Sequence, residues 1–241
     1  AKKGGDTSAW TVNVKPGFYP LREPLTFTPE DSGTAAAPVT WRGAGEASEI
    51  SGGAPLVGWR DTGKGWFETD APTGPDGEPI WFEMLWVNGR RAANAPYPKG
   101  ENWLVPGVCA QEILSKDAKG KATRTRESLT VMDETLRRLL DAAPAAEVPY
   151  VHLIVHQKWN ATKRPVVAWQ GGRLFTEGTV AWNWSQKWNA EAIYRVGNLP
   201  GAFTAPGEWF YDRTGRKVLY RPLPGETPQT LRALAPLAKL S

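Results

Sequence analysis

Short strands bounded by glycine run from residue 10 to residue 59, and they constrain the fold more than any other feature of the chain. No helical period separates them, and Gly43, Gly45, Gly52 and Gly53 punctuate the stretch at turn-like intervals. The apolar runs are Trp10–Val14, Leu25–Thr28, Pro38–Trp41 and Ala54–Val57. Strands of four or five residues that turn in small steps predict the first rungs of a parallel β-helix, in which each rung packs about 4.8 Å from the next.

The middle of the chain changes character. Residues 80–87 form the most apolar run, and Asn88-Gly89 then gives a strong type I′ hairpin signal. Residues 99–128 are polar with little pattern, and we expect a solvated, mobile loop there. The single helix follows, because Asp133 can cap it, three leucines share one face and Pro144 ends it.

The second half returns to strands, with a different spacing. Runs of β-branched and aromatic residues extend from 150 to 222, separated by short turns such as Gly171-Gly172 and Thr214-Gly215. The spacing is typical of antiparallel hairpins, and the strand after Thr214-Gly215 should pair with the strand before it.

Five motifs occur together in an order that resembles a known family. They are PGFYPLREPLTFTPEDSGTAAAPVTWRGAG, ISGGAPLVGW, LWVNGRRAANAPYP, the strand containing His156 and Trp159, and APGEWFYDRTGRKVLYRPLPGE. The order is similar to the N-terminal part of secreted bacterial β-helix glycoside hydrolases, over nearly the whole chain. Ala93-Asn94-Ala95-Pro96 departs from the pattern, because many relatives have an arginine shortly before this proline. The resemblance implies that the main β-helix and its catalytic carboxylates follow this chain, so we expect the front part of a longer or nicked protein.

Composition excludes several classes of function. Twenty-nine basic and 25 acidic residues are scattered along the chain, so neither nucleic acid nor a membrane surface is an expected partner. No apolar run approaches the roughly 20 residues of a membrane span. One cysteine permits no internal disulfide, and no cofactor or metal motif is present. With the family resemblance, we expect a secreted or periplasmic protein that needs no cofactor.

Two carboxylates are weak candidates for catalysis. Glycoside hydrolysis needs a pair of carboxyl groups about 5 to 9.5 Å apart, and Glu208 and Asp212 share one face of a predicted strand. The alternative is a hairpin that carries charges near its turn. His152 and His156 also share a face, but in an extended strand they lie about 13 Å apart, too far to bind one metal ion.

The 13 tryptophans, about three times the average usage, suggest contact with sugar rings. Most tryptophans in β-rich proteins fill cores, so packing remains the alternative for each one. The densest cluster runs from Trp182 to Asn189 and interleaves indoles with amides and a lysine. The candidate substrate-binding residues are Trp159, Trp182, Trp184, Trp188, His156 and Arg90.

We therefore predict an all-β protein: the start of a right-handed parallel β-helix, an inserted antiparallel barrel-like or sandwich-like module, and one short helix. The predicted domains are residues 1–83, the module at 84–228, and a return towards the β-helix at 229–241. The leading function is the N-terminal portion of a polysaccharide-acting glycoside hydrolase that shapes the substrate cleft. Its expected partners are a polysaccharide or oligosaccharide and a further C-terminal β-helix segment or companion fragment. A carbohydrate-binding module without catalysis and a structural β-helix surface protein remain alternatives.

Overall fold

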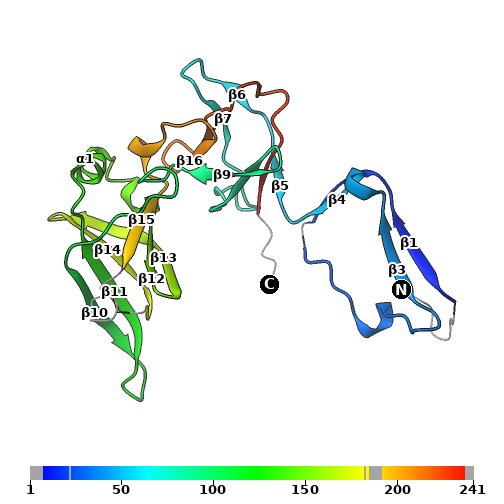
Figure 1. Ribbon diagram of the computed structural model, residues 1–241, viewed down its shortest axis with the longest axis horizontal. Coiled ribbons are helices and arrows are strands. Elements are labelled where there is room, and N and C mark those ends of the chain that lie inside the picture. Colours follow the sequence, from blue (N-terminus) through cyan, green and yellow to red (C-terminus); the bar gives the residue numbers. More distant parts are fainter. Residues whose placement is uncertain (1–7, 22, 182, 185–191, 237–241) are drawn as a thin grey trace. The chain divides into compact units, whose positions relative to one another are not determined.

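The computed structural model describes residues 8–21, 23–181, 183–184 and 192–236, and these form many strands and one α-helix (Figure 1). The chain divides into two compact units. Unit 1 comprises residues 1–57, 80–90 and 232–241, and unit 2 comprises residues 58–79 and 91–231.

Unit 1 begins with two parallel strand pairs. β1 (Trp10–Val14) pairs with β3 (Val39–Gly43), and β2 (Gly17–Pro20) pairs with β4 (Ser48–Ser51). The Ser48 hydroxyl donates to the carbonyl oxygens of Val14 and Lys15 at 2.9 Å, which ties the two pairs together. Short 3₁₀ turns lie at Pro29–Asp31 and Gly45–Ala47.

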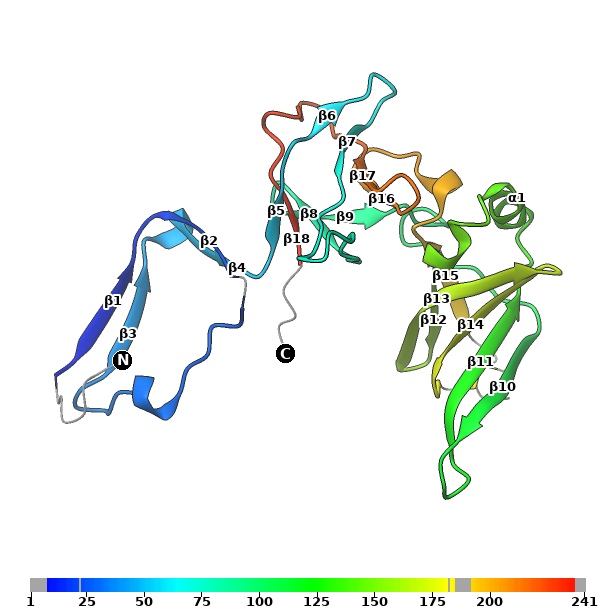
Figure 2. The same cartoon turned by 180° about the vertical axis from the view of Figure 1, so that it is seen from behind.

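A group of three hydrogen-bonded strands completes unit 1 (Figure 2). Its central strand is β18 (Ala233–Ala235), which runs antiparallel to β5 (Ala54–Leu56) on one side and to β8 (Leu85–Val87) on the other. Alternation along β8 buries Leu85 and Val87 completely and leaves Trp86 42% exposed. Asn88 and Gly89, with φ of 48° and 78°, then make the predicted turn.

A six-stranded sheet forms the larger part of unit 2, in the order β10-β11-β14-β13-β12-β15. Every neighbouring pair in it is antiparallel. Gly171 and Gly172 have φ of 57° and 73°, which lets β13 turn directly into β14. The strands are β10 (Cys109–Lys116), β11 (Ala122–Thr130), β12 (His152–Gln157), β13 (Asn160–Gln170), β14 (Arg173–Thr179) and β15 (Ile193–Gly197).

The remaining strands of unit 2 are in the order β9-β16-β17-β7-β6. β16 and β17 form the hairpin that the sequence predicts around Thr214-Gly215, and β16 pairs with β9 in parallel. Their bounds are β6 (Arg60–Asp61), β7 (Phe67–Asp70), β9 (Arg90–Asn94), β16 (Glu208–Asp212) and β17 (Lys217–Tyr220). Two 3₁₀ turns, at Val148–Tyr150 and Pro200–Ala202, also belong to unit 2.

The helix α1 (Glu134–Ala142) is confirmed, together with its cap: the Asp133 carboxylate accepts a 2.7 Å hydrogen bond from the backbone N–H of Leu136. Leu136 and Leu140 are buried in the core of the six-stranded sheet. That core is lined by fully buried Leu129, Leu153 and Tyr194 among others.

The all-β prediction with one helix is confirmed, but the mobile loop predicted at 99–128 is wrong. Most of that stretch is the hairpin β10–β11. The inward positions of β11 include Thr125 and Glu127, so the usual alternation of apolar and polar residues is hidden. The strand pairs described are antiparallel except for β1–β3, β2–β4 and β9–β16, which are parallel. The right-handed parallel β-helix and the predicted domain boundaries remain predictions.

Candidate functional site

A hollow of about 360 Å³ in unit 1 combines an aromatic face with charged groups. We call it the Trp86 hollow; it is lined by Glu49, Ser51, Gly52, Gly53, Trp86, Gly89, Arg232, Leu234 and Pro236. Trp86 and Leu234 are register partners on β8 and β18, so both side chains lie on the same face of the sheet.

Arg232 and Glu49 provide the charges of the hollow. The Arg232 guanidinium lies 2.7 Å from the Glu49 carboxylate and 4.6 Å from the centroid of the Phe18 ring. The backbone of Arg232 is bound on both sides by Asn88, at 2.9 Å in each case. Both charged side chains are about half exposed, so both are accessible to a ligand.

Glycine keeps the hollow open. A Cβ atom at Gly53 would lie 3.1 Å from the Cβ of Leu234 and 3.3 Å from the Ser51 hydroxyl oxygen. Any side chain at that position would therefore crowd the strand β18 beside the hollow.

Glu208 and Asp212, the weak catalytic candidates, both have structural partners. Glu208 is buried, pairs with Lys99, and accepts backbone N–H groups of Thr204 and Ala205 at 2.9 and 3.0 Å. Asp212 accepts the N–H of Gly215 at 2.7 Å inside the hairpin turn. Four positions along β16 place the two residues about 13 Å apart. This is longer than the separation between the two carboxyl groups in either a retaining or an inverting glycosidase. Their catalytic role remains a prediction, and these contacts do not favour it.

The predicted binding residues do not form one site. Trp184 is 3% exposed and belongs to the core of unit 2, while Arg90 is exposed in unit 1. Trp182 and Trp188 lie outside the described residues. Trp159 is 79% exposed at the turn between β12 and β13, and His156 is exposed on β12.

Around His156 the structure assembles residues that the sequence did not single out. The ring of Trp103 meets that of His156 edge-on, with centroids 4.5 Å apart, and the Arg195 guanidinium lies 5.3 Å from the Trp103 centroid. We call Trp103, His156, Arg195 and the neighbouring Ile154 and Lys163 the Trp103 patch.

For Trp86, the sequence did carry a signal. In a strand with alternating burial, Trp86 is the one outward position between Leu85 and Val87.

Comparison with known proteins shows a shared fold. A solved structure described as "Glycoside hydrolase" aligns with 95% of this chain at 24% identity and a TM-score of 0.67. The likeness is one of fold. The chain spans only 38% of the length of that protein. Neither a protein-family model nor a curated protein matches the chain.

Two further findings concern the part of the chain that the structure describes. No cluster of three or more histidine, cysteine, aspartate or glutamate side chains is arranged to bind a metal ion there. None of the described helices has the length and apolar character needed to cross a membrane.

Proposed function

We propose that this chain is the N-terminal portion of a secreted or periplasmic glycoside hydrolase that acts on a polysaccharide. In this proposal the chain shapes and partly lines the substrate cleft, and the catalytic carboxylates lie on another segment. The observation that carries it is the Trp86 hollow. An exposed indole beside a fixed carboxylate–guanidinium pair suits a sugar, whose C–H face packs on the ring while its hydroxyl groups bond to the charges.

The size of the hollow supports a saccharide. At about 360 Å³ it lies near the lower end of the range for small-molecule sites. Glu49 and Arg232 neutralise each other, so the hollow favours an uncharged sugar. The fold shared with part of a glycoside hydrolase agrees with this proposal.

The proposed further β-helix segment has a surface on which to pack. Leu25, Phe27, Trp41 and Ile50 are between 47% and 56% exposed, and with Val14 they line a hollow of about 200 Å³ in unit 1. We call this set the apolar face of unit 1. Exposed apolar surface of this kind supports the proposal that another segment packs there, and the two parallel strand pairs have edges on which further rungs of a right-handed β-helix would add.

Binding of neutral oligosaccharides tests the Trp86 hollow. We expect Trp86→Ala to weaken binding by about tenfold or more in calorimetric titrations, because loss of one stacking face costs about 1.4 kcal/mol. Trp41→Ala is the matched control, since Trp41 is 49% exposed in the same unit and lies outside the Trp86 hollow. Equal losses in both variants, or no saccharide binding by the unmodified chain, would contradict the proposal.

A second measurement separates the hydrolase portion from a carbohydrate-binding module, which the Trp86 hollow would also suit. The intact mass of the protein in its source, under denaturing conditions, should exceed 26.5 kDa or include a companion fragment. That larger protein should release reducing ends from a polysaccharide. Saccharide binding by a source protein of 26.5 kDa that cleaves nothing would favour the binding module instead.

A further inference from the structure

The register of unit 2 places two cations and an indole in one row. On β12, Ile154 pairs with Lys163 of β13 on one side and with Arg195 of β15 on the other. Leu104 bridges to Tyr194 through two backbone hydrogen bonds of 2.8 and 2.9 Å, which brings Trp103 beside Arg195. Because paired residues of antiparallel strands point to the same side, Lys163, Ile154, Arg195 and Trp103 form one row across the sheet.

The next row along β12 adds His156, which is a register partner of Ile193 and Ala161. Its ring meets the edge of Trp103, so the indole contacts both His156 and Arg195. Trp103 is half-buried by these contacts, and His156 remains exposed. Contacts with Trp103 therefore link the side chains of His156 and Arg195 in the Trp103 patch.

Arg195 is the unusual member of the Trp103 patch. Within the described residues, no carboxylate forms an ion pair with it, and its guanidinium donates one long hydrogen bond of 3.4 Å, to the carbonyl oxygen of Pro98. Arg195 is half-buried, so its charge is partly removed from water, and this burial lowers the pKa of the guanidinium. A partly desolvated cation is stabilised when an anion binds it, so this group is suited to receive one.

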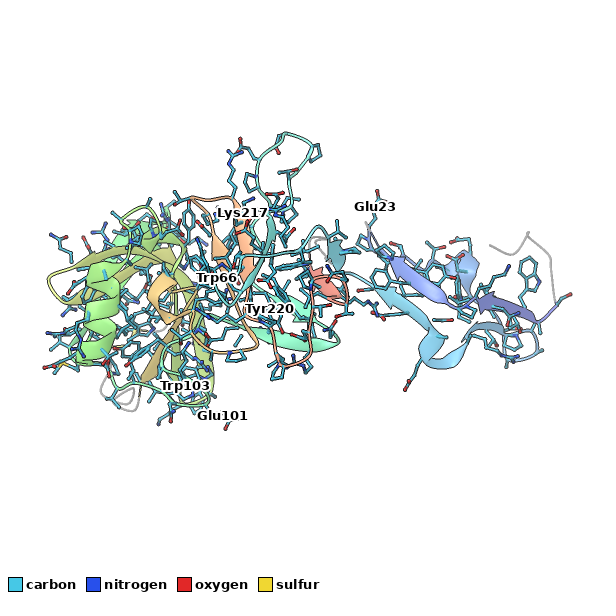
Figure 3. All side chains as sticks on the ribbon, turned by 90° about the horizontal axis from the view of Figure 1, so that it is seen from above. Glu23, Trp66, Glu101, Trp103, Lys217 and Tyr220 are labelled. Carbon is cyan, nitrogen blue, oxygen red and sulfur yellow. The ribbon has the colours of Figure 1, made fainter. Side chains whose placement is uncertain are left out.

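The described residues on this face of β12, β13 and β15 include no acidic side chain. The positions of β12, β13 and β15 that share this face carry Lys163, His152, His156 and Arg195, and none of them is acidic. Glu101, two residues from Trp103, is exposed (Figure 3). In the described part of the chain it forms no ion pair with these cations. Trp159, at the β12–β13 turn, offers a second open indole.

We propose that the Trp103 patch binds an acidic sugar residue, with Arg195 receiving the carboxylate of a uronic acid. The planar guanidinium matches a carboxylate in shape and donates several hydrogen bonds to it. The imidazole of His156 on β12 and the indole of Trp159 at the β12–β13 turn are exposed, and in this proposal they pack against sugar rings that adjoin the carboxylate. The inference rests on the proposed function for its ligand class, a saccharide, and adds a preference for acidic units at a site in unit 2 that shares no residue with the Trp86 hollow.

A matched pair of ligands tests this preference. Oligogalacturonate and its methyl ester have the same backbone and differ in the carboxylate charge. We expect the chain to bind the acid about tenfold or more tightly than the ester, because only the charged carboxylate forms charge-assisted hydrogen bonds with the guanidinium. Arg195→Gln should reduce that ratio to near one. Arg195→Lys, which keeps the charge without the planar fork, should give an intermediate ratio.

Arg138→Gln is the control, because Arg138 is an exposed arginine on α1 and the variant has the same net charge as Arg195→Gln. Its ratio of acid to ester affinity should match that of the unmodified chain. Thermal unfolding of each variant shows whether it is folded. If Arg195→Gln does not fold, Arg195→Lys still tests the role of the planar guanidinium. Equal affinity for acid and ester, or equal losses in Arg195→Gln and Arg138→Gln, would overturn the inference.

The two proposals fail separately. If the acid preference is absent while Trp86→Ala still weakens binding of neutral oligosaccharides, the inference about Arg195 is wrong and the proposed function stands. If Trp86→Ala changes nothing while Arg195→Gln removes the acid preference, the Trp86 hollow is wrong and the Trp103 patch stands. A sulfated oligosaccharide that binds more tightly than oligogalacturonate would overturn the assignment of a carboxylate.

Discussion

Unit 2 closes around its own core, whereas unit 1 leaves much of its apolar surface exposed. In unit 2, Leu129, Leu153, Val155 and Tyr194 are at most 1% exposed. In unit 1, the Phe27 and Trp41 rings contact each other edge-on with centroids 5.4 Å apart, yet each remains about half exposed. Long antiparallel strands joined by hairpins form a sheet wide enough to bury its apolar face within one unit. Short parallel strand pairs bury their apolar side chains only when further rungs pack on them.

The largest expected effect concerns the buried ion pair of unit 2. Glu127 is fully buried, pairs with Arg164, and accepts a 3.0 Å hydrogen bond from Gln111. Arg164→Met should lower the free energy of unfolding by about 3–5 kcal/mol, because it leaves a buried carboxylate without its cation. Denaturant unfolding measures the loss.

Two variants calibrate that experiment. The double variant Glu127→Leu/Arg164→Met should recover much of the stability, since no charge is then buried alone. Arg126→Met breaks a 2.6 Å pair with Glu177 that is partly open to solvent, and should lower the free energy of unfolding far less than Arg164→Met. If Arg126→Met cost as much as Arg164→Met, burial would not explain the difference.

Truncation of apolar side chains compares the two units directly. Leu153→Ala removes a side chain that is 1% exposed, and should lower the free energy of unfolding by about 2–5 kcal/mol. Ile50→Ala, at 47% exposure on the apolar face of unit 1, should change it by no more than about 0.5 kcal/mol in the isolated chain. A large loss from Ile50→Ala would mean that unit 1 buries this face already.

The smallest expected effect is on the alkylation rate of the single cysteine, Cys109, which reports how far β10 in unit 2 is shielded from solvent. Burial raises the pKa of the Cys109 thiol, so less thiolate forms at pH 8 than in a free cysteine. Alkylation of the native chain should be several-fold slower than in urea. The thiol's contribution to stability should be complete at neutral pH and decline as pH rises above the unfolded pKa, because the unfolded thiol loses its proton first. Equal rates in native and unfolded protein would show that this end of β10 is open.

Part of the candidate site could be predicted from the sequence. His156 and Trp159 are exposed on unit 2, but Trp103, which contacts His156, and Arg195, which contacts Trp103, come from segments more than 30 residues away along the chain. No local pattern connects those segments, because a bridge between Leu104 and Tyr194 sets the contact. In the same way, Trp184 belongs to the densest aromatic cluster of the sequence and yet is buried.

The sequence by itself determined the local elements: the short strands of unit 1, the Asn88-Gly89 turn, the capped helix and the hairpin of β16 and β17. These depend on residues within a few positions of one another, where glycine, capping and alternation act. Only the tertiary structure decided that β10 and β11 pair, that Glu208 is enclosed by Lys99 and two backbone N–H groups, and that Arg232 faces Glu49 beside Trp86. Those contacts join distant segments, and they form because strand pairing and burial align side chains that have no relation along the chain.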